Sequence, residues 1–407
     1  MLRIRYDTLI RISIFSRSYA TYKMTRTKLI FFLFIIGLGF LGAFLSGFYL
    51  KAYFSPKAND FPILNQAYHI LINHAYTTLP EPPGLEYGMI RGLLESSTDP
   101  YATFQEPVQH ELESNNLQGS FGGIGVEFNY DSDRNLIIFP IGNGPAAKAG
   151  IKKGDRLLQV DQLSVNTDTS LDDLKAAVRG PIGEPVNILV YRSNVEPILE
   201  FEIIREEIHL PSVTWRISPD DATVGIIKMN IIAESTSQEI IDAVDQLQHE
   251  GVEKFIIDLR DNGGGLLTAG IEISRLFLQD GIIIQQQYQG ENVETFRAAK
   301  PGDLSGIPLV ILINEKTASA AEIIAGALQS NARAILIGVN SFGKDSIQLI
   351  FDLDDGSSMH ITAAKWWFPN LDHPISEGGL VPDIEIYQDD SPVDVILNAA
   401  VKYYKDH

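Results

Sequence analysis

The sequence predicts a multidomain α/β protein with a membrane helix at its N-terminus. Three observations lead to this prediction. Residues 29–50 form one uncharged apolar run, residues 118–207 contain short strands with short helices, and strands and helices alternate from residue 210 onward. A chain of 407 residues, 45% apolar and 21% charged, has globular composition and enough length for two or three domains.

Composition excludes several classes of site and partner. The chain has no cysteine, which rules out disulfides, thiolate chemistry and zinc–thiolate sites, and nothing in it points to a metal or another cofactor. The net charge of −20 is unevenly placed, since residues 1–51 carry +7 and the remainder carries −27. Because phosphate binding needs a basic surface, the acidic body argues against nucleic acid as a partner.

The apolar run Leu29–Leu50 is long enough to span a membrane. Its 22 uncharged residues would form a helix roughly 33 Å long. Seven Lys and Arg residues lie in the basic segment 1–28, so we expect the N-terminus in the cytoplasm, one membrane pass, and the acidic body outside the cell membrane. Secretion after cleavage of a signal peptide is the alternative, although no A-x-A site follows the run. Met24 is a second candidate start, and the topology argument holds from either methionine.

Residues 61–115 are predicted to be helical, after a short linker over 51–60. Apolar residues recur at helical spacing on both sides of a proline-rich break at 80–83. Neither half of this segment carries residues that suggest chemistry.

Residues 118–207 resemble a PDZ domain. The most specific feature is the string P-A-x-x-A-G-I-x-x-G-D over 145–155, in which a helical turn must end on Gly150 and the next turn follows at Gly154. The resemblance implies that the peptide's terminal carboxylate binds backbone N–H groups of a glycine-rich turn, while the peptide adds as a strand. That turn is Gly122, Gly123, Ile124, Gly125 and Val126; a plain hairpin turn is the alternative. Arg179 follows the helix bordering this groove, where it contacts the ligand or is simply solvated.

Ser319 lies where the strand Leu309–Ile313 gives way to a helix of small residues. With Glu322 three residues later it matches a capping box, in which the serine only accepts a backbone N–H. The same position suits a nucleophile, because free N–H groups at a helix start carry partial positive charge. The N–H of Ala320 would then face the oxyanion formed when the Ser319 hydroxyl attacks a carbonyl.

A serine nucleophile needs a base, and the sequence offers three candidates in this domain. His360 and His373 are two of them. Lys344 is the third, provided that burial lowers its pKa enough for the amine to lose its proton. It lies at the start of an apolar strand predicted from Gly343 onward, and Gln348 lies four residues later on the same predicted strand face, where a neutral amide could orient the amine. An edge-strand lysine that discourages aggregation is the other interpretation.

A second oxyanion donor is predicted in the segment Asp258–Gly265 (DLRDNGGG). Three glycines after a buried strand leave backbone N–H groups bare and approachable. A phosphate-binding loop is the rival interpretation, but the G-x-x-x-x-G-K-[ST] pattern is missing.

Together these motifs resemble the carboxy-terminal processing peptidases, which are tail-specific serine proteases with a PDZ domain. D-L-R-x-N-x-G-G, T-A-S-A-x-E-I and F-G-K with glutamine four residues later occur in the family's order, and serine and lysine are 25 residues apart, as in the family. The resemblance implies a serine-protease core over 208–390 related to the layered ClpP/crotonase-like fold, followed by a C-terminal helix over 391–407. It implies Ser319 as nucleophile, Lys344 as base and Gln348 as its partner, with Gly264 or Gly265 and Ala320 as oxyanion donors. Substrates would be proteins or peptides with free C-termini.

Two departures from the family pattern and two rival functions stay open at this stage. Gly263 stands where proline is common, and Asp345 follows the lysine where glycine is common, so Asp345 would hold Lys344 charged unless it points away. The rivals are a membrane-tethered PDZ scaffold with an inactive hydrolase domain, and a serine hydrolase with a histidine base. The sequence leaves open whether the protein forms an oligomer or uses an adaptor.

Overall fold

The structure is a computed structural model. It describes residues 61–80, 82–166, 169–193, 198–371, 373–389 and 392–406, together with Ile36, Leu38, Gly39 and Ser46. The predicted membrane helix over Leu29–Leu50 therefore lies almost wholly outside the described residues. Within the described residues, no helix combines the length and the apolar character needed to cross a bilayer. The chain forms two compact units, Met1–Glu81 and Pro82–His407.

The described part of the first unit is the helix α2 (Pro62–His74) and the residues that follow it. Pro62 stands in the first helical turn, where its missing N–H removes no hydrogen bond. The helix ends where the N–H of Ala75 donates to the carbonyl of Leu71. None of its residues is buried within this unit.

The second unit begins with α3 (Pro82–Glu95), β1 (Thr103–Gln105) and α4 (Pro107–Gln118). The helical prediction over 61–115 missed β1. This strand of three residues is too short to give a periodic signal, and it pairs in antiparallel register with β18 (Ser358–Trp367), about 250 residues away in sequence. Asp99 fixes the turn before β1, since its carboxylate accepts the Tyr101 N–H and also holds Thr362 of β18.

The β-rich module has its own hydrophobic core. Its six-stranded sheet follows the order β3 (Val126–Tyr130), β4 (Leu136–Pro140), β5 (Asp155–Val160), β7 (Pro185–Tyr191) and β8 (Leu199–Ile204), with β6 (Leu163–Ser164) beside β5. The helices α5 (Pro145–Ala149) and α6 (Leu171–Val178) cover it, and β2 (Ser120–Gly123) pairs with β9 (Glu206–His209). As predicted, α5 ends on Gly150, whose φ of 100° favours glycine.

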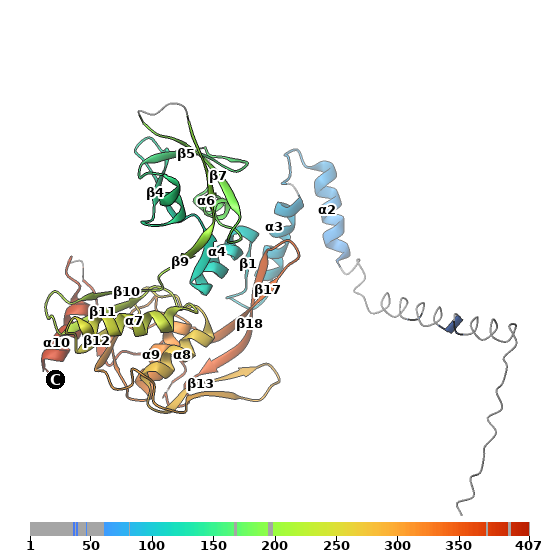
Figure 1. Ribbon diagram of the computed structural model, residues 1–407. Helices are drawn as coiled ribbons and strands as arrows, with labels where there is room; N and C mark the ends of the chain where they lie inside the picture. Colours follow the sequence, from blue (N-terminus) through green and yellow to red (C-terminus); the bar gives the residue numbers. More distant parts are fainter. Residues whose placement is uncertain are drawn as a thin grey trace, which may run out of the picture. The chain divides into compact units, whose positions relative to one another are not determined.

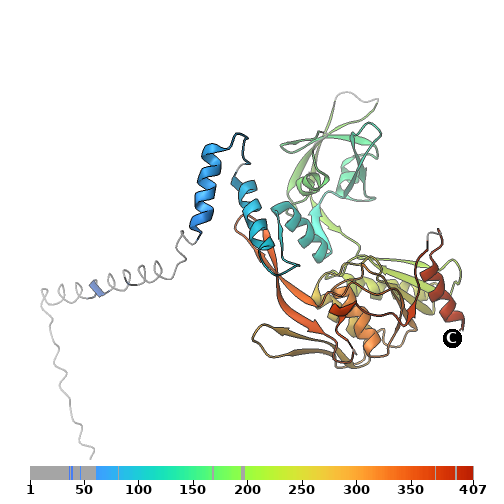
Figure 2. The same cartoon turned by 180° about the vertical axis from the view of Figure 1, so that it is seen from behind.

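A second six-stranded sheet forms the centre of the larger domain (Figures 1 and 2). Its order is β10 (Val213–Ile217), β11 (Val224–Met229), β12 (Lys254–Asp258), β15 (Leu309–Ile313), β16 (Ile335–Gly338) and β19 (Ile384–Glu385). All pairs are parallel except β10 with β11. Such a sheet brings the loops that follow β12 and β15 to one edge.

Helices cover both faces of this sheet. The face that includes Ile257 and Ile311 packs against α7 (Thr236–His249), α8 (Leu267–Phe277) and α9 (Ala320–Ser330). The neighbouring residues Ile256 and Val310 point the other way and pack against α10 (Val395–Asp406). The alternation of side chains along each strand therefore builds two separate cores, as expected for an α/β layered domain.

A third sheet carries the strand that follows Lys344. It is built from β1, β18, β13 (Gly281–Tyr288) and β14 (Glu294–Ala298), while β17 (Ser346–Asp352) pairs with β18 in the long hairpin drawn in orange-red in Figures 1 and 2. The sequence predicts that the strand begins at Gly343, but β17 begins at Ser346. Gly343 has a φ of 90°, and the N–H groups of Gly343 and Lys344 donate to a side chain instead of to a strand.

Candidate active site

Ser319 lies directly before α9, at the sheet edge where the loops after β12 and β15 meet. Its φ of 55° and ψ of −122° are unusual for a residue with a side chain. A conformation of this kind costs about 1–3 kcal/mol and is retained only where its surroundings enforce it. The loops enforce it here, because the Ala318 N–H donates to the carbonyl of Asn262 and the Thr317 hydroxyl donates to that of Leu259.

The glycines after β12 touch Ser319. A β-carbon added to Gly264 would lie 2.8 Å from the β-carbon of Ser319 and 2.8 Å from the carbonyl oxygen of Ala318, so only glycine fits there. The Gly264 N–H donates to the side-chain oxygen of Asn262, at 2.8 Å. Within the described residues, the N–H groups of Gly265 and Ala320 have no hydrogen-bond acceptor. These two donors are therefore free to bind a substrate oxygen.

Lys344 and Gln348 are brought together as the sequence predicts, although by a different route. Lys344 lies in a loop rather than on the strand, and β17 carries an irregularity between Ile347 and Gln348. The Lys344 Nζ nevertheless donates to the Gln348 Oε1 at 2.5 Å. The Gln348 Nε2 in turn donates to the carbonyl of Tyr101 at 2.6 Å, which fixes the amide with its oxygen toward the lysine.

The surroundings of Lys344 favour its neutral form. Burial lowers the pKa of the amine, while the charges of Asp99, Glu113 and Glu322 oppose that shift. The Tyr101 ring, with its centroid 5.2 Å from Nζ, favours the charged form and so opposes the effect of burial as well. Asp345 is no obstacle, since its carboxylate pairs with the Lys365 amine at 2.6 Å.

Glu322 joins the loop of Ser319 to the loop of Lys344. It is fully buried, and burial raises the pKa of its carboxyl, a shift opposed by the hydrogen bonds that it accepts. One oxygen accepts the Ser341 hydroxyl and the Gly343 N–H, both at 2.6 Å. The other accepts the N–H of Ser319 at 2.8 Å and that of Lys344 at 2.9 Å. The predicted capping box is therefore only half of its role.

In the part of the chain that the structure describes, the Ser319 hydroxyl has no hydrogen bond to His360, His373 or Lys344, so hydrogen bonding to the serine does not distinguish the three candidate bases. His360 is buried on β18, where its Nε2 lies 3.3 Å from the Ser358 hydroxyl and 4.0 Å from Glu113. Burial lowers the pKa of the imidazole. His373 is half-buried in the segment after β18 and has no hydrogen bond to a described residue.

Comparisons with known proteins identify the family. The family model for peptidase family S41 matches residues 223–386, and that for the PDZ domain matches residues 141–192. The carboxyl-terminal-processing protease of Picosynechococcus sp. is 35% identical over 307 residues, covering 74% of this chain and 73% of the relative. The chain belongs to the carboxyl-terminal-processing proteases.

A second relative points to the same family. The carboxyl-terminal-processing protease of Synechocystis sp. is 34% identical over 326 residues, covering 77% of this chain and 76% of the relative. A solved photosystem II D1 C-terminal processing protease is 27% identical, with 81% of this chain and 88% of that chain covered and a TM-score of 0.43. The sequence-based recognition of the family and of its PDZ domain is confirmed.

The PDZ domain of this carboxyl-terminal-processing protease places Arg179 beside the glycine-rich turn. A β-carbon at Gly122 would lie 2.1 Å from the carbonyl oxygen of Gly180, so the turn and the end of α6 are in close contact. The Arg179 guanidinium stacks on the Phe121 ring, 3.8 Å from its centroid. Its Nη1 is buried and has no hydrogen-bond partner among the described residues, and burial lowers the pKa of the group. Arg179 is thus not a solvated arginine, and its Nη1 can still donate to a ligand.

A cleft of about 470 Å³ adjoins the glycine-rich loop after β12 in this protease. Gly263, Gly264 and Gly265 form one wall, and α4 contributes Leu112 and Asn116. Asn230, Ile231 and Asp172 of α6 complete the lining, together with further residues of α4. A substrate chain that reaches Ser319 through this cleft would pass between the protease domain and the PDZ domain.

Sequence reasoning missed three residues of this site. Tyr101 and Asp99 come from the segment before β1, some 250 residues from the strands that they hold, and no motif marks them. Glu322 was visible as a helix cap, but its bonds to Gly343 and Lys344 depend on a turn that only the fold defines. The described residues contain no cluster of three His, Asp or Glu side chains suited to a metal ion.

Proposed function

We propose that this carboxyl-terminal-processing protease is a serine endopeptidase that cleaves proteins near their C-termini with a Ser319–Lys344 pair. One observation carries the proposal: Lys344, whose buried amine has a lowered pKa and is oriented by a neutral amide, donates its backbone N–H to the same Glu322 oxygen as the backbone N–H of the strained Ser319. An amine that takes up a proton during catalysis must be neutral beforehand, and burial shifts the pKa of Lys344 toward that state.

The reaction follows from this arrangement. The neutral Lys344 amine takes the proton of the Ser319 hydroxyl while the serine oxygen attacks the peptide carbonyl. Backbone N–H groups stabilise the oxyanion that forms. We assign these to Ala320 and Gly265, because the Gly264 N–H already donates to Asn262. Lys344 then gives the proton to the leaving amine, and water hydrolyses the acyl-enzyme with the lysine again acting as base. Gln348 keeps the amine oriented throughout.

Cleavage of a peptide with a free C-terminal tail tests the proposal. Ser319→Ala should abolish cleavage and leave the fold intact, because the loss of a helix-start serine costs about 1 kcal/mol. Ser330→Ala, at the other end of α9, is the matched control and should cleave normally. Lys344→Ala should be inactive and His360→Ala should retain activity. Failure of the wild-type chain to cleave would point instead to the PDZ scaffold. A fully active Ser319→Ala variant would refute Ser319 as the nucleophile, and an active Lys344→Ala with an inactive His360→Ala would point to the histidine base.

We also infer that the PDZ domain binds the substrate's C-terminus at Gly122–Val126. The turn offers backbone N–H groups, and the unpaired Nη1 of Arg179 beside it gives a positive donor suited to a carboxylate. Binding there would hold the tail while the preceding chain enters the cleft next to Gly265.

The sequence further leads us to propose a membrane anchor at Leu29–Leu50, with the protease domain outside the cytoplasm. The basis is the uncharged run of 22 residues and the excess of Lys and Arg before it. Fractionation of cells that express the full chain tests this. We expect the full chain to stay in the membrane fraction after a carbonate wash and its protease domain to be accessible to an external protease. Recovery of a shortened chain in the medium would indicate signal cleavage instead.

A further inference from the structure

The structure assigns a positioning role to Asp394, which precedes α10: through Arg260 it holds the loop that carries the oxyanion donors. This inference rests on the proposed function, since it concerns how Gly265 is kept in place for the reaction. Asp394 directly precedes α10, which packs on the face of the sheet opposite to α9, and the residues concerned belong to neither the proposed catalytic set nor the PDZ groove.

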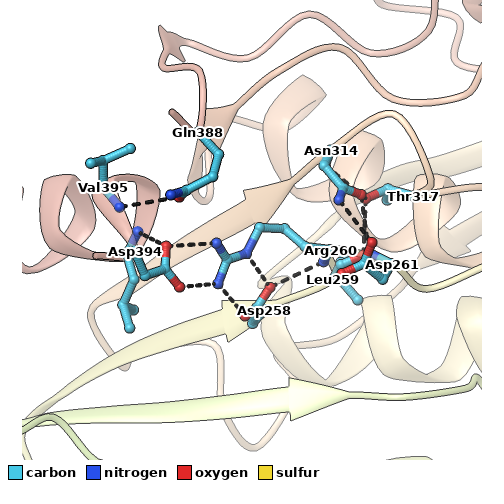
Figure 3. Close-up of polar contacts among 10 residues, drawn as sticks. Asp258, Leu259, Arg260, Asp261, Asn314, Thr317, Gln388, Asp394 and Val395 are labelled. Atoms are coloured by element: carbon cyan, nitrogen blue, oxygen red, sulfur yellow. Dashed lines mark hydrogen bonds and ion pairs between the residues drawn. The ribbon is translucent and has the colours of Figure 1, made fainter. Parts of the chain in front are cut away.

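Arg260 is clamped between two carboxylates, as Figure 3 shows. Its Nε and Nη2 donate to Asp258 at 2.8 and 2.7 Å, and its Nη1 and Nη2 donate to Asp394, both at 2.8 Å. Both contacts are bidentate, which fixes the plane of the guanidinium as well as its position. Asp258 ends β12, while Asp394 is 134 residues after Arg260 in sequence.

The ion pair of Arg260 with Asp258 is largely buried. The side chains of Arg260 and Asp258 are only 15% and 6% exposed. Burial alone would lower the pKa of the guanidinium, but the hydrogen bonds and charges of Asp258 and Asp394 raise it above its usual value. Removing one carboxylate would leave the buried guanidinium with half of its partners. The Arg260 side chain would then move toward water, because an incompletely paired charge is costly to bury.

The clamped residue begins the turn that leads to the oxyanion loop. The next residue, Asp261, has a φ of 62°, and its N–H donates to the Asn314 side chain at 3.0 Å. Asn262 is buried; its carbonyl accepts the Ala318 N–H and its side chain accepts the Gly264 N–H. Arg260, Asp261, Asn262 and Gly264 are thus each held by a specific hydrogen bond, and Arg260 is the point at which this series is fixed to Asp394, directly before α10.

Asp394 has a second contact that allows a clean test. Its Oδ1 also accepts the Leu397 N–H at 2.9 Å, which caps the start of α10. Asparagine caps helices as well as aspartate does, so Asp394→Asn keeps the helix start and removes only the charge that holds Arg260. The chain supplies a matched control in Tyr404→Phe. The Tyr404 hydroxyl donates to the carbonyl of Phe255 at 2.7 Å, which joins the same helix to the far end of the same strand.

The experiment compares the wild-type chain, Asp394→Asn, Asp394→Glu and Tyr404→Phe on a tailed peptide, below the lowest melting temperature of the set. The second readout is inhibition by a peptide aldehyde, whose adduct with a serine hydroxyl places an oxyanion against the same donors. Because removal of one such donor costs about 10²–10³ in rate, displacement of the loop should lower kcat about tenfold or more. KM should stay nearly unchanged.

Support for the inference is a parallel loss of kcat and of aldehyde affinity in Asp394→Asn, partial recovery in Asp394→Glu, and normal values in Tyr404→Phe. A kcat for Asp394→Asn within about twofold of the wild type overturns it. Equal losses in Tyr404→Phe also overturn it, because general loosening of α10 would then explain the effect. Failure of the proposed function is a different result: the wild-type chain would not cleave, or Ser319→Ala would cleave equally well.

Discussion

The substitution Glu322→Gln tests how Ser319 and Lys344 are held together. Each oxygen of the carboxylate accepts two donors, one pair from Ser341 and Gly343 and the other from Ser319 and Lys344. An amide of the same shape has one oxygen and one NH₂ group. Whichever way it turns, two of the four donors face an NH₂ group and lose their acceptor.

The magnitude follows from these contacts. A hydrogen bond to a charged acceptor contributes about 1.5–3 kcal/mol, and two would be lost, while the cost of burying the carboxylate is relieved. We therefore expect the free energy of unfolding to fall by about 3 kcal/mol. Because misplacing a catalytic group by about 1 Å can lower the rate about 10²-fold, kcat should fall by about that factor in the folded variant.

The pH dependence of kcat gives an independent test of the role of Glu322. The charge of Glu322 raises the pKa of Lys344, against the effect of burial. Its removal lowers the pKa of the amine further, so the neutral base is present at lower pH. The rising limb of the pH–rate profile should move to lower pH while the plateau drops.

Initial rates on a tailed peptide, measured well below the melting temperature, test both expectations. Glu239→Gln is the matched control, since Glu239 also accepts two backbone N–H groups, from Ser212 and Val213, away from Ser319. It should lose stability and keep kcat and its pH profile. A Glu322→Gln variant with normal kcat and an unmoved limb would refute the idea that this carboxylate positions the pair.

Three further predictions concern the glycine loop, the base and the tail-binding groove. Gly264→Ala should lower kcat at least tenfold, because the φ of 103° at Gly264 and its contact with Ser319 exclude a β-carbon. Gly263→Ala is the control: its β-carbon would meet nothing within 4 Å, so its kcat should be close to normal in the same assay. Glu113→Gln should move the rising limb to lower pH, because Glu113 raises the pKa of Lys344; an unmoved limb would exclude that influence. A peptide acid should bind more tightly than its amide in a calorimetric titration of Ser319→Ala, and Arg179→Gln should reduce the difference; equal affinities would contradict carboxylate recognition at the groove.

The residues that the sequence revealed are those whose role depends on neighbours in the chain. Ser319 was found because a helix follows a buried strand there, and Gly264 because several glycines follow another. Lys344 and Gln348 were paired on the assumption of a regular strand. The strand starts later, and the contact is formed by a loop and an irregular register instead. The contact depends on that loop, because residues four apart in a regular strand share a face but lie about 13 Å from each other.

The residues that the sequence did not reveal act across long separations. Tyr101 reaches Gln348 over 247 residues, and Asp394 reaches Arg260 over 134. Neither stands in a pattern that periodicity or composition can detect, since each contact depends on which elements the fold sets side by side. The short strand β1 was missed for the same reason, because its pairing partner β18 defines it.

The central claim is that the neutral amine of Lys344 is the base for Ser319, and Lys344→Arg tests it most directly. Arginine keeps the charge and much of the reach, but it cannot lose its proton at working pH. The rate of tailed-peptide cleavage by Lys344→Arg should be as low as that of Lys344→Ala, with both proteins folded. Substantial turnover by Lys344→Arg would mean that the lysine supplies only a positive charge near the site, and the serine–lysine mechanism would be wrong.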